Sequence, residues 1–128
     1  MMTKDQIREQ LGTEAAKFKI EPVKNEDGSI LCYVRETNGL RSQSIQARFW
    51  KSDPLKPGFL HCNDVFGLSV AWIAASVCTE QGELIYEEAD EAAIKGWTRT
   101  LIARIAEPAR SINGEGAIKE SVDTEIKN

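Results

Sequence analysis

The sequence predicts an α+β protein, mainly α-helical, with a small N-terminal antiparallel β-hairpin packed on the helices. The strongest observation is the run 64–78, which carries no charge after Asp64 and has Ser69 and Ser76 as its clearly polar side chains. A helix that is apolar nearly all round belongs in a protein interior, and this run is shorter than the roughly 20 residues that cross a bilayer. The second observation is an Asp-Gly turn within 25–29. It lies between two short alternating segments, which indicates a hairpin.

The first residues predict a short helix. Thr3 and Gln6 have the spacing of a capping box, Ile7 and Leu11 share one helix face, and Gly12 is a typical stop signal. A helix of about two turns is marginal by itself. We therefore expect this segment either to dock on another surface or to fray.

The hairpin is expected near 17–23 and 29–36. Pro22 lacks an amide N–H, so it places the first strand at a sheet edge or ends its pairing there. Because side chains alternate along a strand, one face should be buried while Tyr33 points the other way. The residues expected on the buried face are Phe18, Ile20, Ile30, Cys32 and Val34.

A loose helical period over 40–51 predicts a helix capped by Thr37 or Asn38. Two prolines and a glycine within 52–58 interrupt this pattern, so we expect a surface loop there. The central apolar helix then begins, with Asp64 or the residue before it as its N-cap.

Two further helices are expected after the central one. The segment 87–95 has its acidic side chains in the first turn, where they should face water, with Glu91 and Lys95 as an i,i+4 ion pair. A longer helix follows, kinked or restarted at Pro108 and stopped by the glycines of 113–116. The apolar residues expected on its buried face are Trp97, Leu101, Ile105 and Ile112.

The length of the chain, 128 residues, predicts one domain. We assign a single globular domain to 1–113. The remaining segment, 114–128, reads as a charged C-terminal tail that is either a frayed amphipathic helix or disordered.

Charge and cysteine usage restrict the classes of function. A net charge of −4 disfavours a dedicated nucleic-acid-binding protein, which is usually basic. The beginning of the sequence has no apolar segment typical of a signal peptide, and Cys32, Cys62 and Cys78 are an odd number at wide spacings. Reduced thiols in the cytoplasm are therefore expected, with no membrane partner.

No pattern in the sequence indicates catalysis. His61 and Cys62 are adjacent, and neighbours in sequence rarely face one pocket as a nucleophile and its base must. The cysteines lack zinc-site spacing, and no glycine-rich phosphate loop or nucleophile elbow is present. We therefore expect no enzyme, with no catalytic, cofactor-binding or metal-binding residues.

One stretch, 41–56, combines basic and aromatic side chains. Three interpretations remain open: an amphipathic helix whose aromatic side chains pack on the core, a protein-docking surface, or a nucleic-acid-binding surface. The acidic remainder of the chain makes nucleic acid the least favoured partner. For protein docking, the residues we select are Arg48, Trp50, Phe59 and Leu60.

Three short motifs resemble those of the tail assembly chaperones of long-tailed bacteriophages and prophages. The first begins with Val34-Arg35-Glu36 at the end of the hairpin and runs to Gly39. The second, Glu80-Gln81-Gly82-Glu83-Leu84-Ile85-Tyr86, leads into an acidic helix start. The third is Ser111-Ile112-Asn113-Gly114 before the tail. The order of segments over roughly residues 16–128 is similar as well.

The resemblance implies a non-enzymatic role in phage tail assembly. Chaperones of this family hold the long, aggregation-prone tape-measure protein, help to recruit tail-tube subunits, and tend to self-associate. Two alternatives are a minor structural or tail-completion protein and a small nucleic-acid-binding regulator that uses the Arg41–Lys56 stretch. If Phe66, Val70 or Trp72 is exposed, the central helix is also a candidate for self-association.

Overall fold

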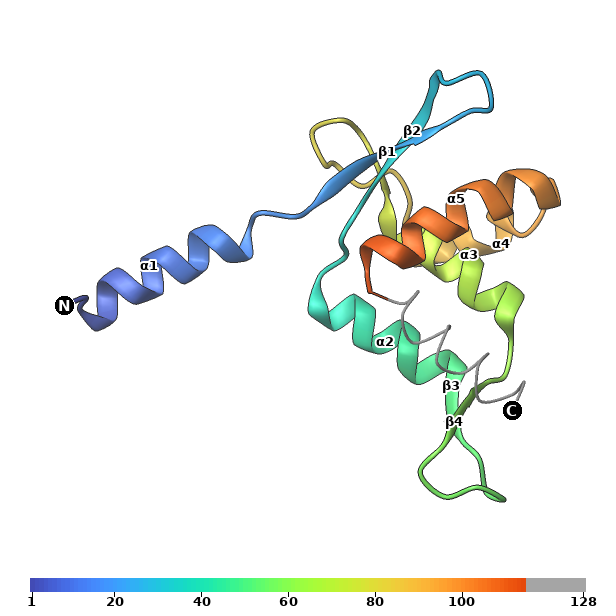
Figure 1. Ribbon diagram of the computed structural model, residues 1–128, viewed down its shortest axis with the longest axis horizontal. Helices are drawn as coiled ribbons and strands as arrows, with labels where there is room; N and C mark the ends of the chain where they lie inside the picture. Colours follow the sequence, from blue (N-terminus) through green and yellow to red (C-terminus); the bar gives the residue numbers. More distant parts are fainter. Residues whose placement is uncertain (115–128) are drawn as a thin grey trace.

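The computed structural model describes residues 1–114, which form an α+β fold built around one central helix, α3 (Figure 1). The predicted fold class is confirmed. The predicted C-terminal tail, 114–128, lies outside the described residues apart from its first residue. In chain order the elements are α1 (Lys4–Ala15), β1 (Ile20–Lys24), β2 (Ile30–Arg35), α2 (Gly39–Phe49), β3 (Trp50–Ser52), β4 (Leu60–Cys62), α3 (Val65–Ser76), β5 (Val77–Cys78), the 3-10 helix η1 (Glu88–Asp90), α4 (Glu91–Ile94) and α5 (Arg99–Ile112).

Helix α3 is the centre of the core, as the sequence predicts. Asp64 is its N-cap, and the Asp64 side chain accepts a hydrogen bond from the Gly67 N–H at 2.9 Å. Every residue from Gly67 to Ser76 is buried, and α3 contacts α2, α4 and α5. Gly67 is needed for this packing, because a Cβ there would lie 2.8 Å from a ring carbon of Phe49 on α2.

Helix α5 packs along α3 as one continuous helix. The predicted restart at Pro108 is wrong: the helix continues through Pro108, and residues on both sides of it, Ala106 and Ala109, are buried, so packing supports the helix there. The predicted buried face is confirmed in part: Ile105 is buried, Leu101 and Ile112 are partly buried against the core, and Trp97, which precedes the helix, packs on the core and edge-on against Tyr86. The residues that α5 buries are Ile102, Ile105, Ala106 and Ala109.

The predicted hairpin is confirmed as β1 and β2, with β5 completing a three-stranded sheet in the order β1-β2-β5. Strand β1, which contains Pro22, lies at the sheet edge. The predicted buried face is wrong in part. The register pairs Val23 with Cys32 and Lys24 with Ile30, so a bulge inverts the alternation of β2. Ile30 therefore shares the outer face with Ile20 and is 51% exposed, while Val23 joins Val34 in the core.

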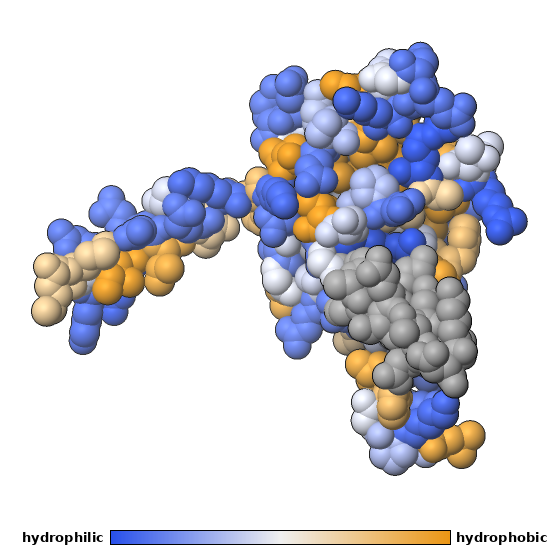
Figure 2. All heavy atoms as spheres, viewed as in Figure 1, coloured by the Kyte–Doolittle hydropathy of each residue, from blue (hydrophilic) through white to orange (hydrophobic). Residues whose placement is uncertain are grey.

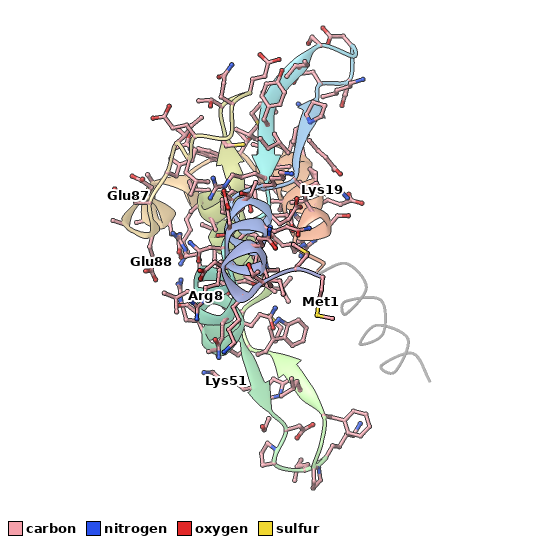
Figure 3. All side chains as sticks on the ribbon, turned by 90° about the vertical axis from the view of Figure 1, so that its left-hand side faces the viewer. Met1, Arg8, Lys19, Lys51, Glu87 and Glu88 are labelled. Carbon is pink, nitrogen blue, oxygen red and sulfur yellow. The ribbon has the colours of Figure 1, made fainter. Side chains whose placement is uncertain are left out.

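A second hairpin, β3–β4, stands where the sequence predicted the end of a helix and a loop. Helix α2, capped by Asn38, ends at Phe49, and Trp50 already has extended backbone geometry. The strands pair antiparallel, with Trp50 opposite Cys62 and Ser52 opposite Leu60. The two hairpins project from opposite ends of the molecule (Figures 1 and 3).

Helix α1 stands apart from this body (Figure 1). The predicted capping box between Thr3 and Gln6 is confirmed, but the helix continues past Gly12 to Ala15. Gly12 has no left-handed backbone geometry that would stop it. None of the α1 residues is buried.

Asn113 joins three segments of the body. Its side-chain oxygen accepts from the Thr37 N–H at 2.9 Å, and its amide nitrogen donates to the Ser76 hydroxyl at 3.0 Å and to the Ala109 carbonyl at 2.8 Å. It therefore ends α5, holds the connection between β2 and α2, and satisfies a buried serine of α3.

The variant Asn113→Ala should lower the free energy of unfolding by about 1–3 kcal/mol, because it leaves the buried Ser76 hydroxyl without this donor. Urea denaturation measures the loss. Ser111→Ala, at an exposed position two residues earlier, is the control and should change the free energy by less than about 0.5 kcal/mol. Equal stability of the two variants would contradict this role for Asn113.

Candidate functional site

The candidate site is an exposed apolar patch on the β3–β4 hairpin and the adjoining first turn of α3. We call it the hairpin patch. Its side chains are between 48% and 90% exposed, and Figure 2 shows apolar groups among charged ones at the lower end of the molecule. The hairpin patch consists of Leu55, Phe59, Leu60, Val65 and Phe66.

Local hydrogen bonds shape the tip of this hairpin. The Asp53 side chain accepts from the Leu55 N–H at 2.9 Å, and the Asp53 N–H donates to the Phe59 carbonyl at 3.0 Å. Gly58 takes the left-handed backbone geometry that closes the turn, with φ of 90°. The turn is therefore ordered by polar contacts, and its apolar side chains are left facing outward.

The structure separates the four predicted docking residues. Phe59 and Leu60 lie in the hairpin patch, 48% and 56% exposed. Trp50 lies at the base of the hairpin, partly buried against the core. Arg48 points from α2 toward α4 and η1, where it binds two carboxylates. Of the four, Phe59 and Leu60 are thus the exposed apolar side chains, at consecutive positions of the hairpin.

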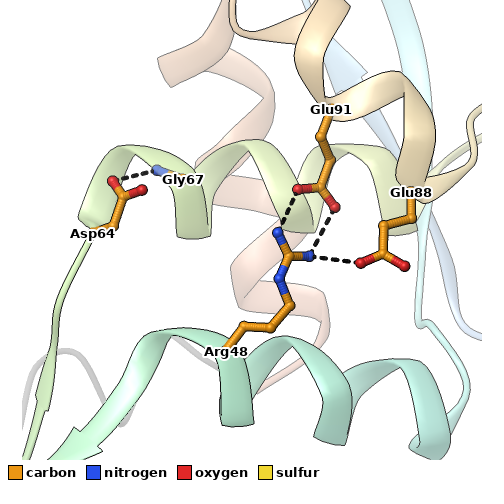
Figure 4. A network of polar contacts seen from close by, with 5 residues as sticks. All are labelled: Arg48, Asp64, Gly67, Glu88 and Glu91. Atoms are coloured by element: carbon orange, nitrogen blue, oxygen red, sulfur yellow. Dashed lines mark hydrogen bonds and ion pairs between the residues drawn. The ribbon is translucent and has the colours of Figure 1, made fainter.

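Arg48 forms a bidentate ion pair with Glu91 (Figure 4). Its two terminal nitrogens lie 3.0 and 2.9 Å from the two carboxylate oxygens of Glu91, and one of them is also 3.1 Å from Glu88. These carboxylates raise the pKa of the Arg48 guanidinium, chiefly through the hydrogen bond to Glu91. Arg48 therefore joins α2 to α4 and serves the fold.

Glu91 corrects an expectation from the sequence. We expected the acidic cluster to face water at a helix N-terminus, with Glu91 paired to Lys95, but Glu91 is 7% exposed and binds Arg48 from another helix. The predicted helix over 87–95 is also shorter, because η1 and α4 divide it. Glu88 remains exposed, as predicted. A pairing between distant segments gave no local signal in the sequence.

The basic stretch predicted as a possible nucleic-acid surface is dispersed. Arg48 is neutralised by two carboxylates, and the Lys51 ammonium group donates to the Ala47 carbonyl at 2.8 Å. Phe49 is buried beneath α3 rather than available for stacking on a base. The continuous row of free cations and exposed rings that such binding uses does not form here.

The thiols and the histidine do not assemble into a reactive centre in the part of the chain that the structure describes. His61 is exposed on β4, opposite Lys51. Burial raises the pKa of the Cys32 and Cys78 thiols, which keeps them protonated. Within residues 1–114, no three His, Cys, Asp or Glu side chains gather to hold a metal ion. No helix among these residues is long and apolar enough to cross a membrane.

Hydrogen bonds connect the segments that contain the three motifs. Arg35 donates to the Gly82 carbonyl at 2.9 Å, which ties the first motif to the second. The Thr37 N–H donates to Asn113 at 2.9 Å, which ties the segment after the first motif to the third. Glu36 accepts from the Lys19 N–H at 2.8 Å. These hydrogen bonds tie the three segments to one another and to Lys19, directly before β1.

Three members of the hairpin patch were not selected from the sequence. Leu55 is 90% exposed at the turn, and Val65 and Phe66 are 57% and 48% exposed at the start of α3. Val65 and Phe66 belong to the apolar run 64–78, which was expected to be buried as a whole. The first turn of this helix extends beyond the body, while the rest is buried. Phe66 is the exposed one of the three helix positions considered for self-association, since Val70 and Trp72 are fully buried.

Comparison of the chain with protein-family models, curated proteins and solved structures gives no match.

Replacing Arg48 by Met should lower the free energy of unfolding by about 2 kcal/mol, because the Glu91 carboxylate would stay buried without its cation. The double variant Arg48→Met/Glu91→Leu should recover most of that loss. Urea denaturation provides the measurement. The control is Arg8→Met, whose ion pair with Asp5 is exposed and should contribute less than about 0.5 kcal/mol. An Arg48 variant as stable as this control would refute the assignment.

Proposed function

We propose that this protein is a phage tail assembly chaperone, a non-enzymatic protein that binds the tape-measure protein in the bacterial cytoplasm and helps to recruit tail-tube subunits. The hairpin patch is the observation that carries this proposal. It places five large apolar side chains on a projecting hairpin and the adjoining helix turn, outside the core. Exposed apolar surface of this kind is typical of protein-binding sites.

The resemblance to tail assembly chaperones supplies the identity of the partner, and the structural connections among its motifs support it. Arg35 joins the segment 34–36 to 80–86, and Asn113 of the segment 111–114 accepts from Thr37, which directly follows the first of these segments. Motif residues that hold the fold together do not determine which side chains the exposed segments present to a partner. The partner surface therefore belongs on the projecting segments and not on the motifs.

The hairpin patch suits an apolar or amphipathic helix as its ligand. Phe59 and Leu60 present an aromatic and a branched side chain from neighbouring positions, and Phe66 lies at the start of the adjoining helix. Anchors of this kind engage the apolar face of a helix. Lys51 and Lys56 on the same hairpin supply positive charge at its rim, which favours acidic side chains on the polar face of the ligand.

Co-expression with the tape-measure protein tests the proposal. The wild-type chain should keep that protein soluble and elute with it on gel filtration. Phe59→Asp/Leu60→Asp should weaken the complex at least about tenfold, since two apolar anchors become charged. The fold should be retained, because both side chains lie outside the core.

Leu40→Asp is the matched control, because Leu40 is 81% exposed in the first turn of α2, at the opposite end of that helix from the hairpin. It should bind like the wild-type chain. If the tape-measure protein stays insoluble with the wild-type chain, the function is wrong. If the hairpin variant binds as well as Leu40→Asp, the docking site is wrong.

A further inference from the structure

Helix α1 carries an apolar side that no other segment within residues 1–114 covers. Ile7 and Leu11 are 44% and 62% exposed, and no residue of the helix is buried. Figure 2 shows apolar side chains gathered along one edge of this arm. A helix of 12 residues is marginal in water without tertiary contacts. The arm therefore needs a partner for its apolar side.

The base of α1 is fixed to the body, which directs the arm outward. The Arg35 guanidinium stacks over the Phe18 ring at 3.9 Å. Lys19 and Glu36 exchange two hydrogen bonds, of 2.8 and 2.9 Å. Only Ala16 and Lys17 lie between this anchor and the end of the helix. With so short a connection, the arm stands away from its own core (Figure 1).

The side chains on the apolar side of α1 form a pattern that is complementary to the same pattern on a second helix running in the opposite direction. At about 100° per residue, Lys4, Ile7, Leu11 and Glu14 fall within an arc of roughly 80°. They are symmetric about position 9: Ile7 mirrors Leu11, and Lys4 mirrors Glu14. Two arms that run antiparallel therefore place Ile7 against Leu11 of the second copy at both ends of the contact.

The same arrangement pairs opposite charges. Lys4 of each arm lies beside Glu14 of the other, while a parallel pair would place Lys4 against Lys4 and Glu14 against Glu14. Glu14 already accepts from Lys17 in its own helix at 2.8 Å, and a carboxylate has two oxygens to share. The basic residues Lys4, Arg8 and Lys17 balance the acidic residues Asp5, Glu9 and Glu14, so two arms meet without net side-chain repulsion although the whole chain has charge −4.

We propose that α1 is a self-association arm, through which two copies of this chain form an antiparallel helix pair with Ile7–Leu11 contacts and Lys4–Glu14 ion pairs. This inference does not rest on the proposed function. The contact between two helices of about 18 Å is smaller than the roughly 800 Å² per partner of stable interfaces. The pair therefore dissociates on dilution.

Sedimentation of the full chain over a wide concentration range tests the pair. The wild-type chain should shift from monomer toward dimer as its concentration rises. Leu11→Asp should raise the dissociation constant at least about tenfold, because it buries a charge at both ends of the contact. Thr13→Asp adds the same charge on the opposite side of the helix and should leave the dissociation constant unchanged. A wild-type chain that stays monomeric, or a Leu11 variant that associates like Thr13→Asp, would overturn the proposal.

Charge reversal tests the antiparallel arrangement. Lys4→Glu and Glu14→Lys should each weaken the dimer about tenfold, and Lys4→Glu/Glu14→Lys should restore it to within about twofold of the wild-type chain. Lys4→Glu favours the isolated helix, because it places an acid in the first turn. Loss of helix therefore cannot account for weaker association of Lys4→Glu, whereas Glu14→Lys also loses the ion pair with Lys17. Single variants that associate as well as the wild-type chain would indicate a parallel pair, in which like charges face each other before and after each change, and would sink the proposed one.

Discussion

The burial of α3 is the constraint on which the rest of the structure depends. From Gly67 to Ser76 every side of this helix is covered, so α2, α4 and α5 must surround it. Neighbours satisfy the two serine hydroxyls that α3 buries. Ser76 accepts from Asn113, and Ser69 accepts from Arg110 at 3.4 Å. The position of α5 along α3 is thus set by polar contacts as well as by apolar packing.

Polar side chains hold the body together at its edges. Arg35 reaches the turn after β5, Arg48 joins α2 to α4, and Asn113 connects the end of α5 to the start of α2. Each contact joins segments at least 43 residues apart in the sequence. Such ties add specificity to a core made largely of aliphatic side chains, which by themselves tolerate shifts in packing. They also account for the charged and amide residues Arg35 and Asn113 within the motifs.

The segments that project from the body carry its exposed apolar side chains. The β3–β4 hairpin and α1 are both shaped by local hydrogen bonds, through Asp53 and through the Thr3–Gln6 capping box. Neither contributes its outermost side chains to the core. The proposed binding to a tape-measure protein and the proposed pairing of two chains thus use separate surfaces. One copy can take part in both contacts at the same time.

The sequence by itself determined the elements whose signals are local. The apolar run 64–78, the Asp-Gly turn and the caps at Thr3, Asn38 and Asp64 predicted α3, the first hairpin and the starts of three helices. Only the tertiary structure decided which faces are buried. A bulge turned Ile30 outward, packing on α3 carried α5 through Pro108, and a distant arginine buried Glu91. For the candidate site, Phe59 and Leu60 were selected from the sequence, while Val65 and Phe66 became visible only where α3 extends past the helices that cover it. Burial depends on contacts between segments far apart in the chain, and periodicity within one segment does not encode them.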